Sequence, residues 1–316
     1  MRILANDGIS PSGIENLESS GFEVITTKVA QEQLSNFIND HKIAAILVRS
    51  ATEVRKKEID ACPTLKLIGR GGVGMDNIDV DYARSKGLHV INTPAASSES
   101  VAELVFAHLF SGVRFLHDAN RNMPLEGDSK FKQLKKAYAN GSELRGKTLG
   151  IVGFGRIGQA TAKVALGLGM KVIFTDHNQE EKNIVLSFFD GQKIDFKLQN
   201  NAFDKVIKNS DFITIHVPTQ KDYVIGKNEF EQMKDGVGII NASRGGTLDE
   251  VALVDALESG KVSFAGLDVY ESEPNPEIRI LMQPKISLTP HIGAATVEAQ
   301  DRIGVELSNQ IIELLK

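Results

Sequence analysis

The sequence predicts an α/β fold made of two doubly wound parallel-sheet domains. Its 316 residues are long for a single hydrophobic core, which favours two domains. Short apolar strands alternate with helical segments along most of the chain, as in parallel sheets covered by helices. The third observation is a glycine-rich turn at residues 153–158, between an apolar strand and a helix.

Residues 1–94 contain the first set of alternating elements. Strands are predicted at residues 3–5, 22–26, 43–48, 65–68 and 89–91, and helices near residues 12–18, 31–39, 53–61 and 80–85. Ligands of open parallel sheets bind beyond the carboxyl ends of the strands. Ligand contacts are therefore expected in the loops 48–52 and 69–74.

The segment 97–121 is predicted as one helix with a serine-rich start. Apolar residues occupy almost every side of its first half, which is not typical of a surface helix. Two interpretations fit equally well: burial between the domains, or burial against a second subunit. The basic run 130–136 that follows is interpreted as a solvated face.

The stretch 147–176 has the pattern of a strand, a turn, a helix and a second strand, and it predicts a dinucleotide site. Gly153 permits the tight turn, Gly155 lets the backbone approach a pyrophosphate, and Gly158 lets the helix pack on its strand. The start of the helix directs its N–H groups at the phosphates. Asp176, 18 residues after Gly158, is placed to accept hydrogen bonds from a ribose.

Asp176 also bears on the choice of cofactor. Its charge would repel a 2′-phosphate, so NAD is expected rather than NADP. His177, when protonated, would attract that phosphate and weakens the preference. The alternative interpretation of Asp176 is a solvated carboxylate at the end of a strand.

The alternation resumes after Asp176 and predicts about six or seven strands for this second sheet. Strands are predicted at residues 212–217, 238–241, 264–269 and 286–289, and helices at 202–208, 230–234 and 248–259. An amphipathic helix is predicted at 296–315. The segment 178–199 allows no assignment.

The composition excludes several classes of protein. The net charge is −5, so no nucleic-acid partner is expected, and local arginines or lysines must hold any anionic substrate. Cys62 is the only cysteine, which fits a reducing cytosol. No export pattern is present and no apolar run is long enough to span a membrane. A cytoplasmic protein without membrane contact or a metal site is therefore expected.

Three loops that follow predicted strands carry side chains suited to acid–base chemistry. Arg244 lies in the loop 241–246, Glu273 in the loop 266–274 and His291 in the loop 289–294. An arginine fork fits a carboxylate, a histidine exchanges protons near neutral pH, and a neighbouring carboxylate stabilises the charged histidine. Singly, these residues could be a surface ion-pair partner, a turn residue and a strand-end histidine. Together, after a dinucleotide motif, they predict an active site.

A series of motifs in a fixed order resembles the D-isomer-specific 2-hydroxyacid dehydrogenase family: VRSAT, GRGGVGMDNID, SVAELVFAHL, GKTLGIVGFGRIG, DFITIHVP, INASRGGTLDE, AGLDVYESEP and PHIGAAT. The resemblance implies a Rossmann-type NAD-binding domain, residues 98–289, inserted in a flavodoxin-like substrate domain formed by residues 1–97 and 290–316. It also implies a homodimer through the NAD-binding domain.

The resemblance assigns roles to single residues. Arg244 would hold the substrate carboxylate and carbonyl, His291 would be the acid/base, and Glu273 would orient His291. The expected cofactor contacts, with Asp268 near the carboxamide, are Gly153, Gly155, Arg156, Ile157, Gly158, Asp176, Val217, Ala242, Ser243, Asp268 and Gly293.

Within the family the chain looks most like the phosphoglycerate dehydrogenase branch, in a short form without a regulatory domain. This likeness implies oxidation of D-3-phosphoglycerate to 3-phosphohydroxypyruvate, the entry into serine synthesis. The expected substrate contacts are Arg49, Ser50, Arg70, Gly72, Val73 and Lys136. His177, Val73 and Val217 depart from residues common in relatives, which puts fine cofactor contacts in doubt.

Two alternatives stay open. Another D-2-hydroxyacid dehydrogenase, such as a glyoxylate or hydroxypyruvate reductase, would act on a small anionic acid without a phosphate. A non-enzymatic NAD-sensing scaffold, like the family's corepressor branch, would bind the cofactor without turnover. Retention of Arg244, Glu273 and His291 counts against the scaffold, and the histidine paired with a glutamate counts against a formate dehydrogenase.

Overall fold

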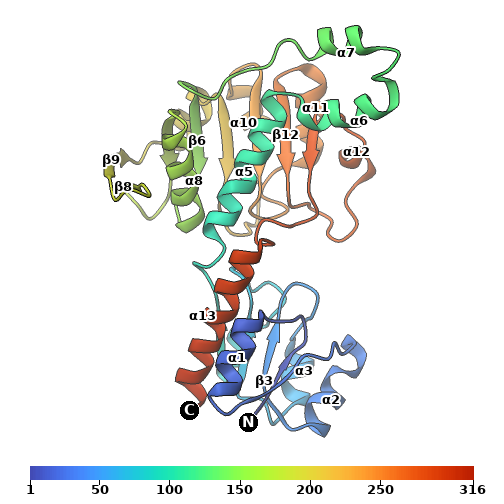
Figure 1. Ribbon diagram of the computed structural model, residues 1–316, viewed down its shortest axis with the longest axis vertical. Coiled ribbons are helices and arrows are strands. Elements are labelled where there is room, and N and C mark those ends of the chain that lie inside the picture. Colours follow the sequence, from blue (N-terminus) through green and yellow to red (C-terminus); the bar gives the residue numbers. More distant parts are fainter. The chain divides into compact units, whose positions relative to one another are not determined.

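The computed structural model describes residues 1–316, which form two compact units (Figure 1). The first unit consists of residues 1–100 and 294–316, and the second of residues 101–293. No helix is both long enough and apolar enough to cross a membrane.

The first unit is built on a five-stranded parallel sheet with the strand order β2-β1-β3-β4-β5. This is the flavodoxin-like order, in which the sheet changes winding direction between β1 and β3. Its strands are β1 (Arg2–Ala5), β2 (Glu23–Ile25), β3 (Ile43–Val48), β4 (Leu67–Arg70) and β5 (His89–Asn92). Its helices are α1 (Pro11–Ser19), η1 (Gln31–Gln33), α2 (Leu34–Asp40), α3 (Lys56–Ala61), α4 (Val80–Ser85) and α13 (Val297–Leu315).

Helix α13 belongs to this unit although it comes from the other end of the chain, and it lies along α1 (Figure 1). The Thr296 hydroxyl accepts from Ala299 N and caps its first turn. Its apolar stripe, Ile303, Leu307 and Ile311, is buried, as the amphipathic pattern predicts.

The second unit holds a six-stranded parallel sheet with the order β13-β12-β11-β10-β6-β7. The strands are β6 (Thr148–Val152), β7 (Lys171–Thr175), β10 (Phe212–Ile215), β11 (Val237–Asn241), β12 (Val262–Leu267) and β13 (Ile286–Leu288). The helices are α5 (Ser98–Val113), α6 (Leu116–Glu126), α7 (Phe131–Ala137), α8 (Arg156–Gly167), α9 (Phe203–Asn209), α10 (Lys227–Gln232), α11 (Glu250–Ser259) and α12 (Ile278–Leu281). The order reverses between β6 and β10, as in a Rossmann-type sheet, so the predicted fold class is confirmed.

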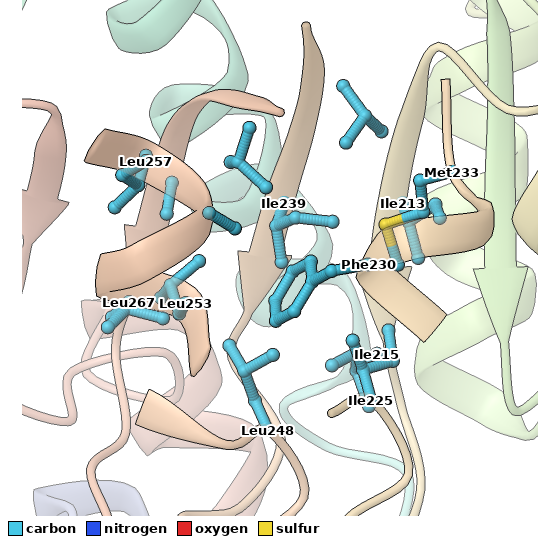
Figure 2. Packing of buried hydrophobic residues seen from close by; sticks show 14 of the residues in the cluster. Ile213, Ile215, Ile225, Phe230, Met233, Ile239, Leu248, Leu253, Leu257 and Leu267 are labelled. Carbon is cyan, nitrogen blue, oxygen red and sulfur yellow. The ribbon is translucent and has the colours of Figure 1, made fainter. Parts of the chain in front are cut away.

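Each face of this sheet is buried by its own set of helices. On one face, Phe230 of α10 and Leu253 and Leu257 of α11 pack on Ile213 and Ile239 of the strands (Figure 2). On the other face, apolar residues of α5 and α8 cover the same strands. Two buried layers of this kind hold the carboxyl ends of the strands rigidly, and the loops that follow them inherit fixed positions.

The segment predicted as one helix at 97–121 is two helices. Phe115 has a left-handed backbone, with φ of 55°, and separates α5 from α6. The buried side of α5 packs on the sheet of its own unit. The helix and the sheet are in close contact there, because a Cβ added to Gly112 would lie only 2.0 Å from the Phe264 ring. The burial of this side of α5 therefore requires neither the other domain nor a second subunit. Exposed apolar residues remain at Phe110, Leu116 and Leu125, and the homodimer stays a prediction.

The unassigned segment 178–199 forms an antiparallel hairpin of β8 (Glu181–Ser187) and β9 (Lys193–Gln199). Ile184 is buried in the layer that contains α8, whereas Phe189 lies fully exposed at the turn. A crossover helix was not predicted there and none is present. The helix predicted at 230–234 begins earlier, at Lys227, and the short helix α12 was not predicted.

Candidate active site

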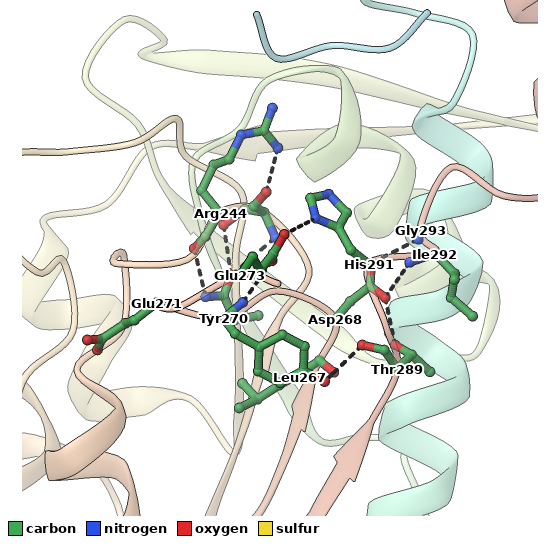
Figure 3. A network of polar contacts seen from close by, with 12 residues as sticks. Arg244, Leu267, Asp268, Tyr270, Glu271, Glu273, Thr289, His291, Ile292 and Gly293 are labelled. Atoms are coloured by element: carbon green, nitrogen blue, oxygen red, sulfur yellow. Dashed lines mark hydrogen bonds and ion pairs between the residues drawn. The ribbon is translucent and has the colours of Figure 1, made fainter. Parts of the chain in front are cut away.

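The residues Arg244, Glu273 and His291 follow the carboxyl ends of three neighbouring strands. Arg244 comes after β11, Glu273 after β12 and His291 after β13, and these strands are adjacent in the sheet. Since the strands are parallel, their carboxyl ends meet at one edge. Figure 3 shows the three side chains gathered there, with the His291 ring turned toward Glu273.

His291 and Glu273 form a direct pair. His291 Nδ1 lies 2.8 Å from Glu273 Oε2, and both side chains are partly exposed. Burial alone would raise the pKa of the Glu273 carboxyl. The hydrogen bond and charge of His291, the Tyr270 N–H and the charge of Arg244 outweigh burial and hold that pKa below its ordinary value. Glu273 is therefore a carboxylate that accepts a hydrogen bond from Nδ1–H and leaves Nε2 facing outward from the pair.

The loop that carries Arg244 is shaped through its backbone. Asn241 Nδ2 and the Thr247 hydroxyl both donate to the Arg244 carbonyl, at 3.1 and 2.8 Å. The guanidinium Nη1 donates to the Ser243 carbonyl at 2.6 Å. A Cβ on Gly245 would lie 1.8 Å from the Tyr270 carbonyl oxygen, so only glycine lets this loop pack on the loop that carries Glu273.

Asp268 anchors the loop that carries His291. Its Oδ1 accepts from the Thr289 hydroxyl at 2.7 Å and from Ile292 N at 2.8 Å, and its Oδ2 accepts from Gly293 N at 2.8 Å (Figure 3). The side chain is 1% exposed. The structure therefore shows Asp268 engaged by the protein itself, whereas the sequence suggested only a cofactor contact.

Tyr270 connects the loop that carries Glu273 to the loop that carries His291. Its hydroxyl donates to the carbonyls of Thr289 at 2.8 Å and Leu267 at 3.2 Å. Burial, together with the charge of Asp268, raises the pKa of the phenol to about 12, so the hydroxyl keeps its proton as a donor. Sequence reasoning missed this residue and also Asn241 and Thr247. For Asn241 the available signal was a polar side chain that ends an otherwise apolar strand.

The glycine turn lies at the reversal of strand order, between β6 and β10. Gly153 follows β6 with φ of 89°, and a Cβ there would be 2.4 Å from the His216 carbonyl oxygen and 2.8 Å from Val217 Cγ1. A Cβ on Gly158 would be 2.3 Å from the Gly153 carbonyl oxygen, so the helix packs on the turn at van der Waals contact. Both glycines are required by close approach.

Gly155 differs, because a Cβ at this position would meet no atom within 4 Å. Gly155 precedes α8, and no side chain caps the N–H groups of that helix start. Open space in front of an uncapped helix start fits a pyrophosphate bound by backbone N–H groups. Arg156 and Ile157 begin the helix at this site.

Asp176 directly follows β7 and lies against this turn. Its carboxylate accepts from Phe154 N at 2.6 Å and from Asn178 N at 2.8 Å. The acidic group is partly exposed beside the glycine turn, which fits the adenosine ribose of NAD. The residues of this edge thus fit the dinucleotide that the motif predicts.

Substitution of Gly155 by alanine is expected to weaken NAD binding at least tenfold without loss of stability. Its φ of −68° suits alanine, and the added methyl group would occupy only the space meant for the pyrophosphate. Gly153→Ala is the contrasting variant, since its clash with the His216 carbonyl should lower the melting temperature as well. Fluorescence titration with NADH and thermal unfolding measure the two effects, and equal NADH affinity in Gly155→Ala and wild type would contradict the assignment.

The expected substrate residues of the first unit share another strand edge. Arg49 and Ser50 follow β3, while Arg70 ends the neighbouring β4 and precedes Gly72 and Val73. Asp7 shapes the first loop by accepting from Arg49 N at 2.7 Å. Burial lowers the pKa of the Arg49 guanidinium, partly offset by the charge of Asp7, and its Nε has no hydrogen-bond partner. A Cβ on Gly72 would lie 2.0 Å from Arg70 Nη1, so the Arg70 side chain folds over this glycine.

Lys136 is not brought to the edge where His291 lies. It is exposed on α7, which Figure 1 shows beyond the amino ends of the strands of the second unit. The remaining expected cofactor residues, Ala242, Ser243 and Gly293, lie in the loops already described. Ser243 is fixed there by hydrogen bonds from its N–H and hydroxyl to Asn241 Oδ1, at 3.1 and 2.8 Å.

Comparison with known proteins identifies the family of the chain. Residues 106–293 match the family model of the D-isomer specific 2-hydroxyacid dehydrogenase NAD binding domain. A hydroxypyruvate reductase of Thermotoga maritima is 41% identical over 99% of this chain and 98% of its own length. A D-3-phosphoglycerate dehydrogenase of Archaeoglobus fulgidus is 39% identical over 100% of this chain, which spans 58% of that relative.

A solved structure extends the likeness to the fold. The crystal structure of a glyoxylate reductase from Paecilomyes thermophila superposes with a TM-score of 0.79, at 30% identity, over 99% of this chain and 95% of that one. The family model covers residues 106–293, and the relatives and the fold agree over nearly the whole chain. The chain belongs to the D-isomer specific 2-hydroxyacid dehydrogenase family and is an NAD-dependent oxidoreductase.

Proposed function

We propose that the chain interconverts D-3-phosphoglycerate and 3-phosphohydroxypyruvate, with His291 as acid/base, Glu273 as its orienting carboxylate and Arg244 as the substrate anchor. The observation that carries the roles is the contact of 2.8 Å between His291 Nδ1 and Glu273 Oε2, next to Arg244. A proton carrier beside a carboxylate-binding arginine, in an NAD-binding unit, suits a 2-hydroxy acid.

The mechanism follows from the protons of this pair. With Nδ1–H donated to Glu273, His291 Nε2 has a lone pair that takes the proton of the substrate hydroxyl during oxidation. Bound NAD supplies the acceptor for the hydride that leaves C2. The Glu273 carboxylate stabilises the charge that His291 gains, and Arg244 binds the substrate carboxylate and the oxygen that becomes a carbonyl. In reduction, His291 returns the proton.

The phosphate is assigned to the arginines of the first unit. Arg49 and Arg70 belong to loops at the carboxyl ends of adjacent strands, and Gly71 N joins these loops by donating to the Val48 carbonyl at 2.9 Å. The Arg49 guanidinium is partly buried and its Nε has no hydrogen-bond partner, which makes it a suitable group for a phosphate oxygen. These features support a phosphorylated substrate.

Hydroxypyruvate is the second candidate substrate. The Thermotoga maritima relative named as a hydroxypyruvate reductase is 41% identical to this chain, slightly more than the 39% of the Archaeoglobus fulgidus phosphoglycerate dehydrogenase. The two candidates differ only in the phosphate, so substitution of a phosphate-binding arginine separates them.

The test compares NADH consumption with 3-phosphohydroxypyruvate, hydroxypyruvate and glyoxylate. We expect the phosphorylated acid to have the highest kcat/KM in wild type. Arg49→Met should lower that value about ten- to hundredfold, because one charged hydrogen-bond donor is lost, and change hydroxypyruvate turnover little. Arg2→Met is the control, since Arg2 forms an exposed ion pair with Glu23 in the same unit.

Two outcomes would contradict the proposal. A wild-type preference for hydroxypyruvate that Arg49→Met leaves unchanged would assign the chain to the second candidate. Absence of turnover with every 2-oxo acid, while NADH still binds, would favour an NAD-sensing scaffold.

A further inference from the structure

A buried histidine that the mechanism does not use lies behind the active-site loops. His108 of α5 is 2% exposed, with Nδ1 2.9 Å from Ser287 Oγ and Nε2 3.1 Å from Thr289 Oγ1. Its backbone approaches β12 closely, because a Cβ on Gly266 would be only 2.5 Å from His108 Cβ. His108 thus links α5 to the middle of the short strand β13 and to the residue that follows its carboxyl end.

The donor and the acceptor in each of these hydrogen bonds follow from the contact between the Thr289 hydroxyl and Asp268. The Thr289 hydroxyl donates to Asp268 Oδ1, so the Thr289 oxygen must accept from His108 Nε2–H. Burial lowers the pKa of His108 to about 4, against the opposing charge of Asp268, so the ring is neutral and carries one proton. Nδ1 then accepts from the Ser287 hydroxyl. Ser287, His108 and Thr289 form one chain of donors that ends at Asp268.

Asp268 connects this chain to the acid/base residue. It accepts from Ile292 N and Gly293 N, the two backbone groups that follow His291. His291 itself has a left-handed backbone, with φ of 55°, which a residue other than glycine adopts only when its surroundings hold it there. The hydrogen bonds closest to this backbone are those that His291 N donates to the Thr289 carbonyl and that Ile292 N and Gly293 N donate to Asp268.

We propose that His108 is a positioning residue for His291: by donating to Thr289 it keeps the Thr289 hydroxyl on Asp268, and Asp268 holds the His291 loop. Through this chain of hydrogen bonds the His291 ring stays within hydrogen-bond distance of Glu273, which orients the ring for proton transfer to and from the substrate. The inference rests on the proposed function, because it requires His291 to be the acid/base.

The first test is His108→Leu, compared with His108→Gln. Leucine fills the space without either hydrogen bond, and the glutamine amide can still donate to Thr289. We expect kcat to fall roughly tenfold in His108→Leu through misplacement of His291, with KM for the 2-oxo acid and NADH affinity changed less than about twofold. His108→Gln should recover most of the loss.

His117→Leu is the matched control. His117 also bridges a helix and the region of β13, but at the amino end of the strand, where its Nε2 lies 2.9 Å from the Pro284 carbonyl oxygen. We expect His117→Leu to lose stability and keep wild-type kcat. An unchanged kcat in His108→Leu would overturn the inference. So would a loss of kcat in both His108→Leu and His117→Leu that is in proportion to their loss of melting temperature.

A second pair decides the matter if His108→Leu does not fold. Thr289→Val removes the hydroxyl at nearly constant shape and should lower kcat roughly tenfold, whereas Thr289→Ser should restore it. Equal kcat in the two would overturn the inference. His291→Asn is measured alongside: if it retains turnover, the proposed function fails first, and if it is inactive while Thr289→Val is normal, only the positioning role fails.

Discussion

His291→Asn is expected to lower kcat by about two to four orders of magnitude while NADH affinity remains unchanged. Asparagine lacks a group that titrates, so neither direction of proton transfer has a carrier. The substitution suits the site in other respects, because asparagine tolerates the left-handed backbone that His291 adopts at φ of 55°. Steady-state rates in both directions and NADH titration measure the two quantities.

The control for this variant is His89→Asn, at an exposed histidine that begins β5. It should behave as wild type. A His291→Asn enzyme that kept more than about a tenth of the wild-type kcat would remove the histidine from the role of proton carrier.

Arg244→Ala is expected to lower kcat/KM by about two to three orders of magnitude, again with NADH affinity retained. The guanidinium is the planar donor next to the His291 and Glu273 pair, and its loss removes both the substrate anchor and a stabilising charge. The loop should keep its fold, because Asn241 and Thr247 hold the backbone carbonyl of residue 244.

Arg244→Lys tests whether geometry or charge matters more. A lysine keeps the charge but offers no planar fork, so we expect it to recover only a small part of the loss. Arg279→Ala removes an exposed arginine that is 3.9 Å from Asp255 and serves as the control. Turnover of Arg244→Ala within about tenfold of wild type would exclude Arg244 as the anchor.

Local patterns were enough to predict the dinucleotide turn. The strand β6, the turn, the helix α8 and the strand β7 occur at the residues where the spacing of Gly153, Gly155, Gly158 and Asp176 indicates them. The elements of this unit follow one another within about 30 residues, and glycine marks the positions of close approach directly. Its sequence pattern and its structure therefore agree.

Two local features had no clear sequence signal. The break at Phe115 is a left-handed residue that is neither glycine nor asparagine, so nothing in the pattern of 97–121 separates α5 from α6. The hairpin β8–β9 buries Ile184 but leaves Phe189 at its turn exposed. Such a two-stranded element has little alternation of buried and exposed residues, and its apolar residues could equally belong to a helix.

The sequence predicted the candidate residues that the structure brings together, and it missed the residues that hold their loops. Arg244, Glu273 and His291 were identifiable because each follows a predicted strand and has a side chain of known chemistry. Tyr270 and His108 were not, because partners of theirs lie on other elements: the Tyr270 hydroxyl donates to the Thr289 carbonyl, and His108 and Ser287 are 179 residues apart. Asn241 and Thr247 were also missed, although their partner, the Arg244 carbonyl, is three residues away in the same loop. A buried polar residue reveals its role only through the partner that satisfies it.

The sequence by itself determined the α/β class, the glycine turn for NAD, and the presence of residue types suited to a proton and a carboxylate, because each depends on local spacing and side-chain chemistry. Only the tertiary structure decided that Asp268 anchors the His291 loop, that His108 stands behind it, and that Lys136 lies away from that edge. The physical reason is the order of strands in the sheet. That order brings distant side chains to one edge, and it results from the packing of the whole unit and not from any single segment.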